Sequence, residues 1–221
     1  MTLCHNSSKY IYTIFVKNHI MTNNSTQSRV TIKILNQMKN NSEKISMLTA
    51  YDFSFAKIID EAGIDIILVG DSASNVMAGH ETTLPITLDQ MIYHASSVVR
   101  AVNRALVIVD LPFGTYQADS KEALKSAIKI MKESGAHAVK LEGGKKIYNS
   151  IQTLVKNKIP VMGHLGLLPQ SDKTFKFKGK KKSERENILK DAKLLERAGV
   201  FSIVLECVET SLAKHVTKQI N

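Results

Sequence analysis

Six short apolar segments, each followed by a helix-like segment, place the strongest constraint on how this chain can fold. The clearest one covers residues 66–69 and reads Ile, Ile, Leu, Val, with Gly70, Asp71 and Ser72 directly after it. A continuous apolar run of this length is typical of a strand buried on both faces, as in a parallel sheet. Strands that alternate with helices form such sheets through right-handed crossovers. The sequence therefore predicts an α/β fold.

The segments between the predicted strands carry signals that start and end helices. Gly63, Gly135 and Gly199 each follow a helix-like segment, where glycine commonly ends a helix. Thr87 and Ser120 are the expected caps of two helices. The expected strands cover residues 46–49, 64–69, 105–109, 138–141, 159–162 and 201–205. The expected helices cover residues 30–38, 53–62, 87–102, 120–134, 145–155, 184–198 and 211–219.

Polar residues stand at the ends of most of these strands. They are Asp71, Asp110, Glu142, His164 and Glu206. An open doubly wound sheet gathers its chemistry at one switch point, whereas a (β/α)8 barrel uses strand ends all around its rim. The distribution favours the barrel, although six units are two fewer than a closed barrel needs. We therefore expect an incomplete (β/α)8 TIM-type barrel with a short N-terminal helix.

Three carboxylates and a lysine are expected to meet at this rim. Asp71, Asp110 and Glu142 follow consecutive strands, and hard oxygen ligands without cysteine suit Mg²⁺ better than zinc. Lys140 lies two residues before Glu142, so both side chains share one face of a strand. Its ammonium could bind a carboxylate or keto oxygen of an anionic substrate. Glu206, from a more distant strand, is the expected base. The set predicts removal of a proton next to a carbonyl, with Mg²⁺ stabilising the enolate.

Taken singly, these residues also have ordinary structural explanations. A carboxylate after a strand commonly caps a helix or stabilises a turn, and we interpret Asp52 as such a cap. Asp71 alone fits a turn as well as a functional role, and His164 alone fits a core or supporting role. Four acids, a lysine and a histidine at successive strand ends are much harder to attribute to capping.

Composition limits the class of protein. The chain has 221 residues, of which 43% are hydrophobic and 23% charged, enough for one domain with a sizeable core. No apolar run approaches the roughly 18–20 residues of a membrane helix. The two cysteines, Cys4 and Cys207, lie far apart, which indicates a buried free thiol and a cytoplasmic location. Residues 1–29 are expected to be a leader or disordered segment, and residues 30–221 the partial-barrel catalytic domain.

The net charge of the chain is +10, and the excess of basic residues is concentrated in one run. Residues 173–182 contain six lysines, with Phe175 and Phe177 between them. We interpret this run as a solvated loop. The alternative is a groove for RNA or a polyanionic substrate tail, in which the phenylalanines stack on bases. No RNA-binding motif accompanies the run, so nucleic acid is not an expected partner.

Seven segments together carry a family resemblance. They are 51–57 (YDFSFAK), 69–72 (VGDS), 79–87 (GHETTLPIT), 110–113 (DLPF), 140–144 (KLEGG), 163–171 (GHLGLLPQS) and 205–208 (LECV). In this order and spacing, from about residue 44 onward, the chain resembles the ketopantoate hydroxymethyltransferase family. The resemblance implies a (β/α)8 barrel, a homo-decamer, Mg²⁺, and 5,10-methylenetetrahydrofolate as the one-carbon donor.

The resemblance also implies roles for individual residues. Asp71 and Asp110 would ligate Mg²⁺, with Glu142 as a further ligand, directly or through water. Glu206 would take the proton from C3 of 3-methyl-2-oxobutanoate, and the enolate would then attack the folate-bound methylene carbon to give 2-dehydropantoate, in pantothenate biosynthesis. The implied substrate-binding residues are Asp71, Ser72, Asp110 and Lys140.

Two other functions stay open at this point. A Mg²⁺-dependent barrel enzyme of the phosphoenolpyruvate mutase and isocitrate lyase kind would share the carboxylates. It usually needs a catalytic cysteine in an active-site loop, and no cysteine lies between Cys4 and Cys207. The other is an inactive, truncated remnant, or a basic binding module that uses residues 173–182. The family pattern contains two further β-α units after the position of Asn221, so we expect open edges on the first and sixth strands.

Overall fold

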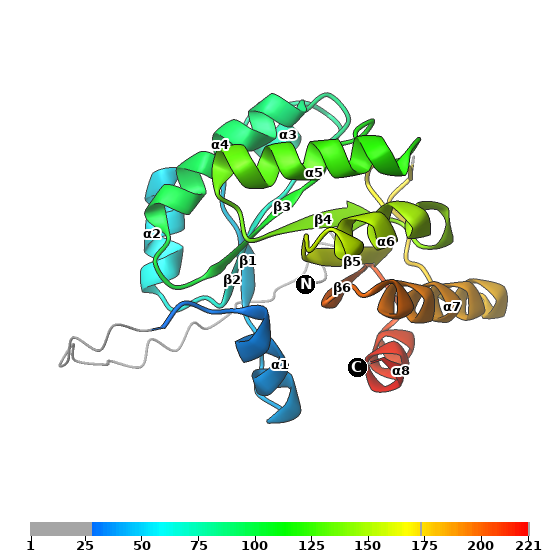
Figure 1. Ribbon diagram of the computed structural model, residues 1–221. Coiled ribbons are helices and arrows are strands. Elements are labelled where there is room, and N and C mark those ends of the chain that lie inside the picture. Colours follow the sequence, from blue (N-terminus) through cyan, green and yellow to red (C-terminus); the bar gives the residue numbers. More distant parts are fainter. Residues whose placement is uncertain (1–27, 173, 221) are drawn as a thin grey trace.

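The computed structural model describes residues 28–172 and 174–220. Six strands in this part of the chain form one parallel sheet in chain order. They are β1 (Met47–Thr49), β2 (Ile66–Val69), β3 (Leu106–Asp110), β4 (Ala138–Glu142), β5 (Val161–Gly166) and β6 (Ser202–Glu206). The sheet curls into part of a barrel whose outermost strands are β1 and β6 (Figure 1). The predicted incomplete α/β barrel is confirmed. The predicted segment 1–29 falls almost wholly outside the described residues and stays a prediction.

Helices connect the strands in the order that the sequence predicts. They are α1 (Ile32–Asn40), α2 (Phe53–Glu61), α3 (Ala73–Val76), α4 (Leu88–Ala101), α5 (Ser120–Ser134), α6 (Tyr148–Lys156), α7 (Lys182–Ala198) and α8 (Thr210–Gln219), with a 3₁₀ turn at Lys145–Ile147. The short helix α3 lies outside the helices that the sequence predicts. No helix among the described residues is long and apolar enough to cross a membrane.

Side-chain caps explain where several of these helices begin. Thr87 caps α4 as predicted, and its hydroxyl accepts a hydrogen bond from the Gln90 amide in a reciprocal capping box. The prediction that Ser120 caps α5 is wrong. Asp119 is the cap, because its carboxylate accepts the amide of Lys121, and Ser120 is the first helical residue.

Alternate strand residues face two different cores, as the period of two in a strand requires. Ile67, Val107 and Val139 are fully buried against the helices on the outer side of the sheet. The residues between them face the inside of the curl. There they pack with Val30 and with Leu35 of α1, so α1 covers part of the inner face. The inner apolar set from the strands is Ile66, Leu68, Leu106, Ile108, Ala138 and Met162.

Strand β5 extends four residues beyond its predicted end. His164 therefore lies within the strand rather than after it. The strand ends at Gly166, whose φ of 98° is in the left-handed region. A Cβ at Gly166 would lie 2.2 Å from the Glu206 carbonyl oxygen. The absence of a side chain allows that carbonyl to accept the Leu167 amide at 2.8 Å, which ties the ends of β5 and β6 together.

The basic loop after β5 is fastened to the end of β6. The Lys178 amide donates to the Cys207 carbonyl at 2.8 Å, and the Glu209 amide donates to the Lys178 carbonyl at 3.0 Å. The Lys178 ammonium pairs with Asp172 at 2.9 Å. Lys180 lies over the ring of Phe177 at 5.7 Å. Part of the lysine charge in residues 174–182 is thus engaged within the chain itself.

Two buried carboxylates secure the opposite end of the sheet. Asp60 accepts the amides of Asn103, Arg104 and Ala105, which lead into β3. Asp65 accepts the amide and hydroxyl of Ser46 and a hydrogen bond at 2.7 Å from the guanidinium of Arg104. Burial by itself raises the pKa of Asp65, but these hydrogen bonds outweigh it and hold the pKa below its usual value.

Replacing Asp65 with asparagine should therefore destabilise the fold in a pH-dependent way. Near neutral pH, Asp65→Asn should lower the free energy of unfolding by about 2 kcal/mol, because it weakens hydrogen bonds to a charged acceptor. The stabilisation by a depressed carboxyl is complete above its unfolded pKa of about 3.9 and is lost as the pH falls through the folded-state value. Urea unfolding across this range should show the difference from wild type shrinking in acid.

The matched control is Asp89→Asn, which removes an exposed carboxylate paired with Lys129. It should leave the unfolding curve nearly unchanged. Equal effects of the two substitutions would contradict the role of Asp65.

Candidate active site

The inner face of the sheet becomes polar at the carboxyl ends of its strands. The inner residues there are Asp110, Lys140, Glu142, His164 and Glu206, and Asp71 follows β2 directly. Each of these five strand residues is separated by an even number of positions from the inward-facing apolar residues of its own strand, so its side chain points to the same face. The predicted site residues therefore gather for one reason, which is the period of two in parallel strands held in register.

An ion pair joins the two middle strands at this rim. Parallel pairing sets Asp110 beside Lys140, and their side chains meet with the Lys140 ammonium 2.7 Å from Oδ1 of Asp110. Both side chains are almost completely buried. Burial lowers the pKa of Lys140, but the surrounding carboxylates of Asp110, Glu142 and Asp71 outweigh it and raise this pKa. The lysine therefore stays charged.

The carboxylates outnumber the positive charge. Burial raises the pKa of Asp71 to about 7, and the charges of Asp110 and Glu142 add to this effect, against Lys140 and a hydrogen bond from Gln170. Burial also raises the pKa of Asp110, in spite of the neighbouring ammonium. Oδ2 of Asp110 accepts the Asp71 amide at 3.1 Å, which brings the two acids together.

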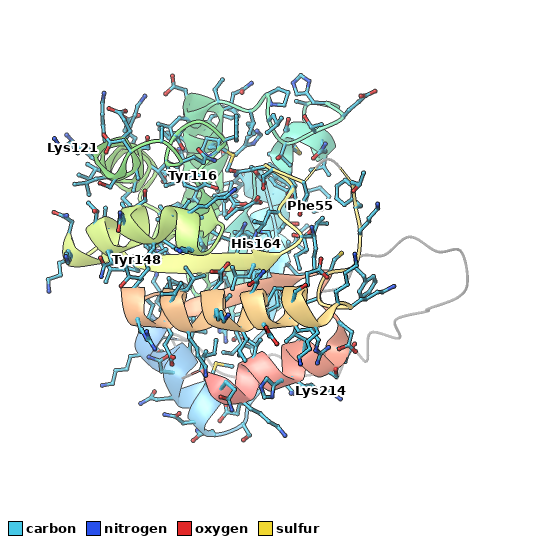
Figure 2. All side chains as sticks on the ribbon, turned by 90° about the vertical axis from the view of Figure 1, so that its right-hand side faces the viewer. Phe55, Tyr116, Lys121, Tyr148, His164 and Lys214 are labelled. Carbon is cyan, nitrogen blue, oxygen red and sulfur yellow. The ribbon has the colours of Figure 1, made fainter. Side chains whose placement is uncertain are left out.

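His164 lies between two acids from different strands. Its Nδ1 is 3.4 Å from Oε1 of Glu142 and also 3.4 Å from the Lys140 ammonium. Its Nε2 is 3.1 Å from Oε2 of Glu206. Burial and Lys140 lower the pKa of His164, but the two carboxylates outweigh them and raise it. The imidazole, shown on β5 near the centre of Figure 2, thus links Glu142 to Glu206.

Ser72 follows Asp71 at the end of β2, and its side chain is partly exposed. Its hydroxyl shares a 2.7 Å hydrogen bond with the hydroxyl of Tyr51. Gly70 makes this packing possible, because a Cβ there would lie 2.7 Å from the Ser72 hydroxyl. Tyr51 was not among the predicted site residues, although it belongs to the segment 51–57 that carries the family resemblance.

Two further buried polar residues complete the cluster, and the sequence reasoning did not single them out. Gln170 donates to Oδ2 of Asp71 at 2.8 Å and, through its backbone amide, to Oε2 of Glu142 at 3.1 Å. Tyr116 accepts the Glu142 amide at 3.1 Å and bonds the Gln170 side chain at 2.7 Å. Gln170 lies in the segment 163–171, whereas no pattern in the sequence marks Tyr116.

The donor set fits a divalent cation held by two carboxylates. Among residues 28–172 and 174–220, no three acidic, histidine or cysteine side chains are arranged to hold a metal ion. Mg²⁺ is commonly bound by one or two carboxylates, with water and substrate oxygens as its other ligands. Asp71 and Asp110 could provide such a pair. Burial is the main cause of the raised pKa values of both acids, and a cation there would stabilise their charged forms.

A groove of about 1210 Å³ lies beside the cluster and shares Glu142 and Gln170 with it. Its walls include apolar side chains and several basic residues of α7. The lining residues relevant here are Phe113, Leu168, Lys190, Lys193 and Arg197. This volume is slightly above the range of about 300–1,000 Å³ that is usual for pockets of drug-sized ligands.

Comparison with protein families gives one match over most of the chain. The model of the family described as "Ketopantoate hydroxymethyltransferase" matches residues 29–221. A protein of Flavobacterium johnsoniae named 3-methyl-2-oxobutanoate hydroxymethyltransferase is 65% identical over 196 residues, which is 87% of this chain and 72% of the relative. The protein of the same name from Christiangramia forsetii is 66% identical over 195 residues, with the same coverage. The one from Porphyromonas gingivalis is 58% identical over 196 residues.

Solved structures of similar fold are more distant in sequence. A 2,3-dimethylmalate lyase, described as a member of the PEP mutase/isocitrate lyase superfamily, matches with a TM-score of 0.62 at 16% identity, covering 85% of this chain and 66% of the other. A phosphonopyruvate hydrolase matches with a TM-score of 0.61 at 11% identity, covering 79% and 62%. At such low identity these matches establish the barrel fold alone.

Removing the only buried ammonium of this cluster should be costly. In metal-free buffer, Lys140→Met should lower the free energy of unfolding by about 3 kcal/mol or more, because buried carboxylates lose their partner. Urea unfolding measures the change. Lys146→Met, which removes an exposed lysine nearby, is the control and should have little effect. If both variants unfolded alike, the ion pair at the rim would not be holding the strands.

Proposed function

Because the chain belongs to the ketopantoate hydroxymethyltransferase family, we propose that it transfers a hydroxymethyl group from 5,10-methylenetetrahydrofolate to 3-methyl-2-oxobutanoate, giving 2-dehydropantoate. The observation that carries this proposal is the buried cluster of Asp71, Asp110 and Lys140, with the carboxylate of Glu206 linked to it through His164. It combines a site for an anionic oxo acid with a separate base.

In this proposal Asp71 and Asp110 hold Mg²⁺, and Glu142 is a further ligand, directly or through water. When bound, Mg²⁺ supplies stabilisation for the negative charge that develops on the oxo oxygen of the substrate. Ser72, Lys140 and the two aspartates bind the oxo acid. The ammonium of Lys140 suits the substrate carboxylate or keto oxygen: burial lowers its pKa, but the neighbouring carboxylates outweigh burial and keep it charged.

Glu206 is the proposed base. It removes the proton from C3 of the oxo acid, and the electron pair left on C3 forms the new bond to the methylene carbon of the folate. Both carbon–nitrogen bonds of that methylene group break, water supplies the hydroxyl oxygen, and tetrahydrofolate leaves with its two nitrogens protonated. The geometry supports this role, because Nε2 of His164 lies 3.1 Å from Oε2 of Glu206, and the other oxygen, Oε1, is the one proposed to face the substrate. The side chain is about one-third exposed, so a bound substrate can reach it.

The groove beside the cluster supports a second, larger substrate. It shares Glu142 and Gln170 with the site, so a ligand bound in it would lie next to the oxo acid. The basic residues Lys190, Lys193 and Arg197 would complement the carboxylates of a folate. The alternative of a mutase or lyase activity has the fold likeness in its favour, but the lyase structure is 16% identical to this chain, against 65% for the hydroxymethyltransferase of Flavobacterium johnsoniae.

We also propose that the protein is a homo-oligomer in the cytoplasm, a decamer by its resemblance to the family. Large apolar side chains are exposed on neighbouring helices, with Phe55 and Ile58 on α2 and Tyr93 on α4. Exposed apolar surface of this kind commonly marks a protein interface. The buried Cys207, which is not in a disulfide, agrees with a reducing compartment.

The base can be tested by proton exchange. The chain with Mg²⁺ in deuterium oxide should exchange the C3 hydrogen of 3-methyl-2-oxobutanoate, followed by proton NMR. Glu206→Gln should slow this exchange by about 10²–10⁴-fold, the usual contribution of a general base. Glu186→Gln, an exposed change on α7, should exchange at the wild-type rate. Equal rates for wild type and Glu206→Gln would exclude Glu206 as the base.

The proposed interface predicts a change in assembly. Phe55→Glu and Tyr93→Glu should each shift the particle to a smaller mass in size-exclusion chromatography with light scattering, because a charge in an apolar interface is costly. Ile128→Glu, on the exposed face of α5, should not change the mass. A wild-type chain that runs as a monomer would contradict the oligomer proposal.

A further inference from the structure

Gln170 is a buried polar residue that the proposed mechanism does not use. It lies in the loop after β5, and its side chain uses its full hydrogen-bonding capacity. Its amide nitrogen donates to Oδ2 of Asp71 at 2.8 Å and to the Leu111 carbonyl at 3.0 Å. Its amide oxygen accepts the hydroxyl of Tyr116 at 2.7 Å and the amide of Gln117 at 2.9 Å.

The surroundings fix which way this amide points. The Gln117 oxygen accepts the Gly114 amide at 2.8 Å, so its nitrogen must face Gln170. The Tyr116 oxygen accepts the Glu142 amide at 3.1 Å, and its proton has two acceptors in reach, the Gln170 oxygen at 2.7 Å and the Glu142 carbonyl at 3.3 Å. A flipped Gln170 would set its nitrogen against the Gln117 nitrogen, which is also a donor, and its oxygen against a carbonyl and a carboxylate. The donor aimed at Asp71 is therefore held in place.

The same residue also restrains Glu142. Its backbone amide donates to Oε2 of Glu142 at 3.1 Å. One residue of a single loop thus binds carboxylates from the ends of β2 and β4, on either side of Asp110. The negative charges of these buried carboxylates repel one another, so the acids need fixed hydrogen-bond donors to stay together. Tyr116, shown with His164 in Figure 2, closes the arrangement between Gln170 and the Glu142 backbone.

We propose that Gln170, oriented by Tyr116, is a positioning residue that holds the carboxylates of Asp71 and Glu142 in the geometry needed for the divalent cation. This rests on the proposed function, which makes those acids the metal-binding groups. Residues that orient metal ligands without touching the metal typically contribute 10–100-fold to metal affinity or activity. Gln170 has the contacts expected of such a residue.

The test is metal binding by the chain without substrate. Titration calorimetry with Mn²⁺ should show a dissociation constant about 10–100-fold higher for Gln170→Met than for wild type. Tyr116→Phe, which keeps the ring and removes the hydroxyl, should weaken binding by about 10-fold. The double variant should be weaker than wild type by less than the product of the two effects, because both act through one contact.

The chain contains a matched control pair. Gln152 on α6 donates to the hydroxyl of Tyr148 at 2.9 Å, and neither residue lines the site. Gln152→Met and Tyr148→Phe should bind Mn²⁺ as wild type does. In the exchange assay, the metal concentration for half-maximal rate should rise for Gln170→Met and stay at the wild-type value for Gln152→Met and Tyr148→Phe.

Two kinds of failure can be told apart. If wild type binds Mn²⁺ and Gln170→Met, folded by circular dichroism, binds it within about twofold, the role of Gln170 is overturned and the proposed function stands. If wild type binds no Mn²⁺ and shows no exchange, the proposed function fails, and the inference fails with it. Should Gln170→Met not fold, unchanged Mn²⁺ binding by folded Tyr116→Phe overturns the inference.

Discussion

The buried ion pair between Lys140 and Asp110 is the interaction on which the rim depends. It joins the two central strands at 2.7 Å, away from water. One ammonium there is shared among three carboxylates, so the cluster keeps a surplus of negative charge even with Lys140 fully charged. Such a surplus is costly in a dry interior. It also suits the site to its proposed function, because a divalent cation can neutralise the surplus and then help to bind an anionic substrate.

Much of this arrangement could be predicted from the sequence because it follows from local periodicity. Apolar runs with polar ends identified the strands, and parallel alignment then brings the ends together. Asp71, Asp110, Lys140 and Glu142 were found in this way. Helix boundaries were less certain where two capping residues are adjacent, and at α5 the carboxylate of Asp119 prevailed over the neighbouring serine.

The contacts that the sequence did not reveal come from loops. Gln170 and Tyr116 reach the site because the chain after β5 and the chain after β3 turn back over the strand ends. No period describes such a path, since it depends on turns and on packing against distant residues. The link from His164 to Glu206 was missed for a related reason, because β5 runs farther than its apolar residues indicate.

The fold alone would not have decided the chemistry. Lyases and hydrolases with the same barrel architecture match this chain at 11–16% identity, whereas relatives named as hydroxymethyltransferases match at 56–66% over most of its length. A barrel rim accepts many sets of side chains. The activity is specified by which residues occupy the strand ends, and here these are the ones that the family motifs contain.

The strand residues of the rim all occupy inward-facing positions, and this limits how genes of this kind can change. Deleting one residue early in β4 would turn Lys140 and Glu142 toward the helices and bring Leu141 and Gly143 to the rim positions. A substitution alters one side chain, but such a deletion moves every following side chain of the strand to the opposite face of the sheet. Insertions and deletions should therefore survive in the loops and be eliminated from the strands, even where individual strand residues vary freely.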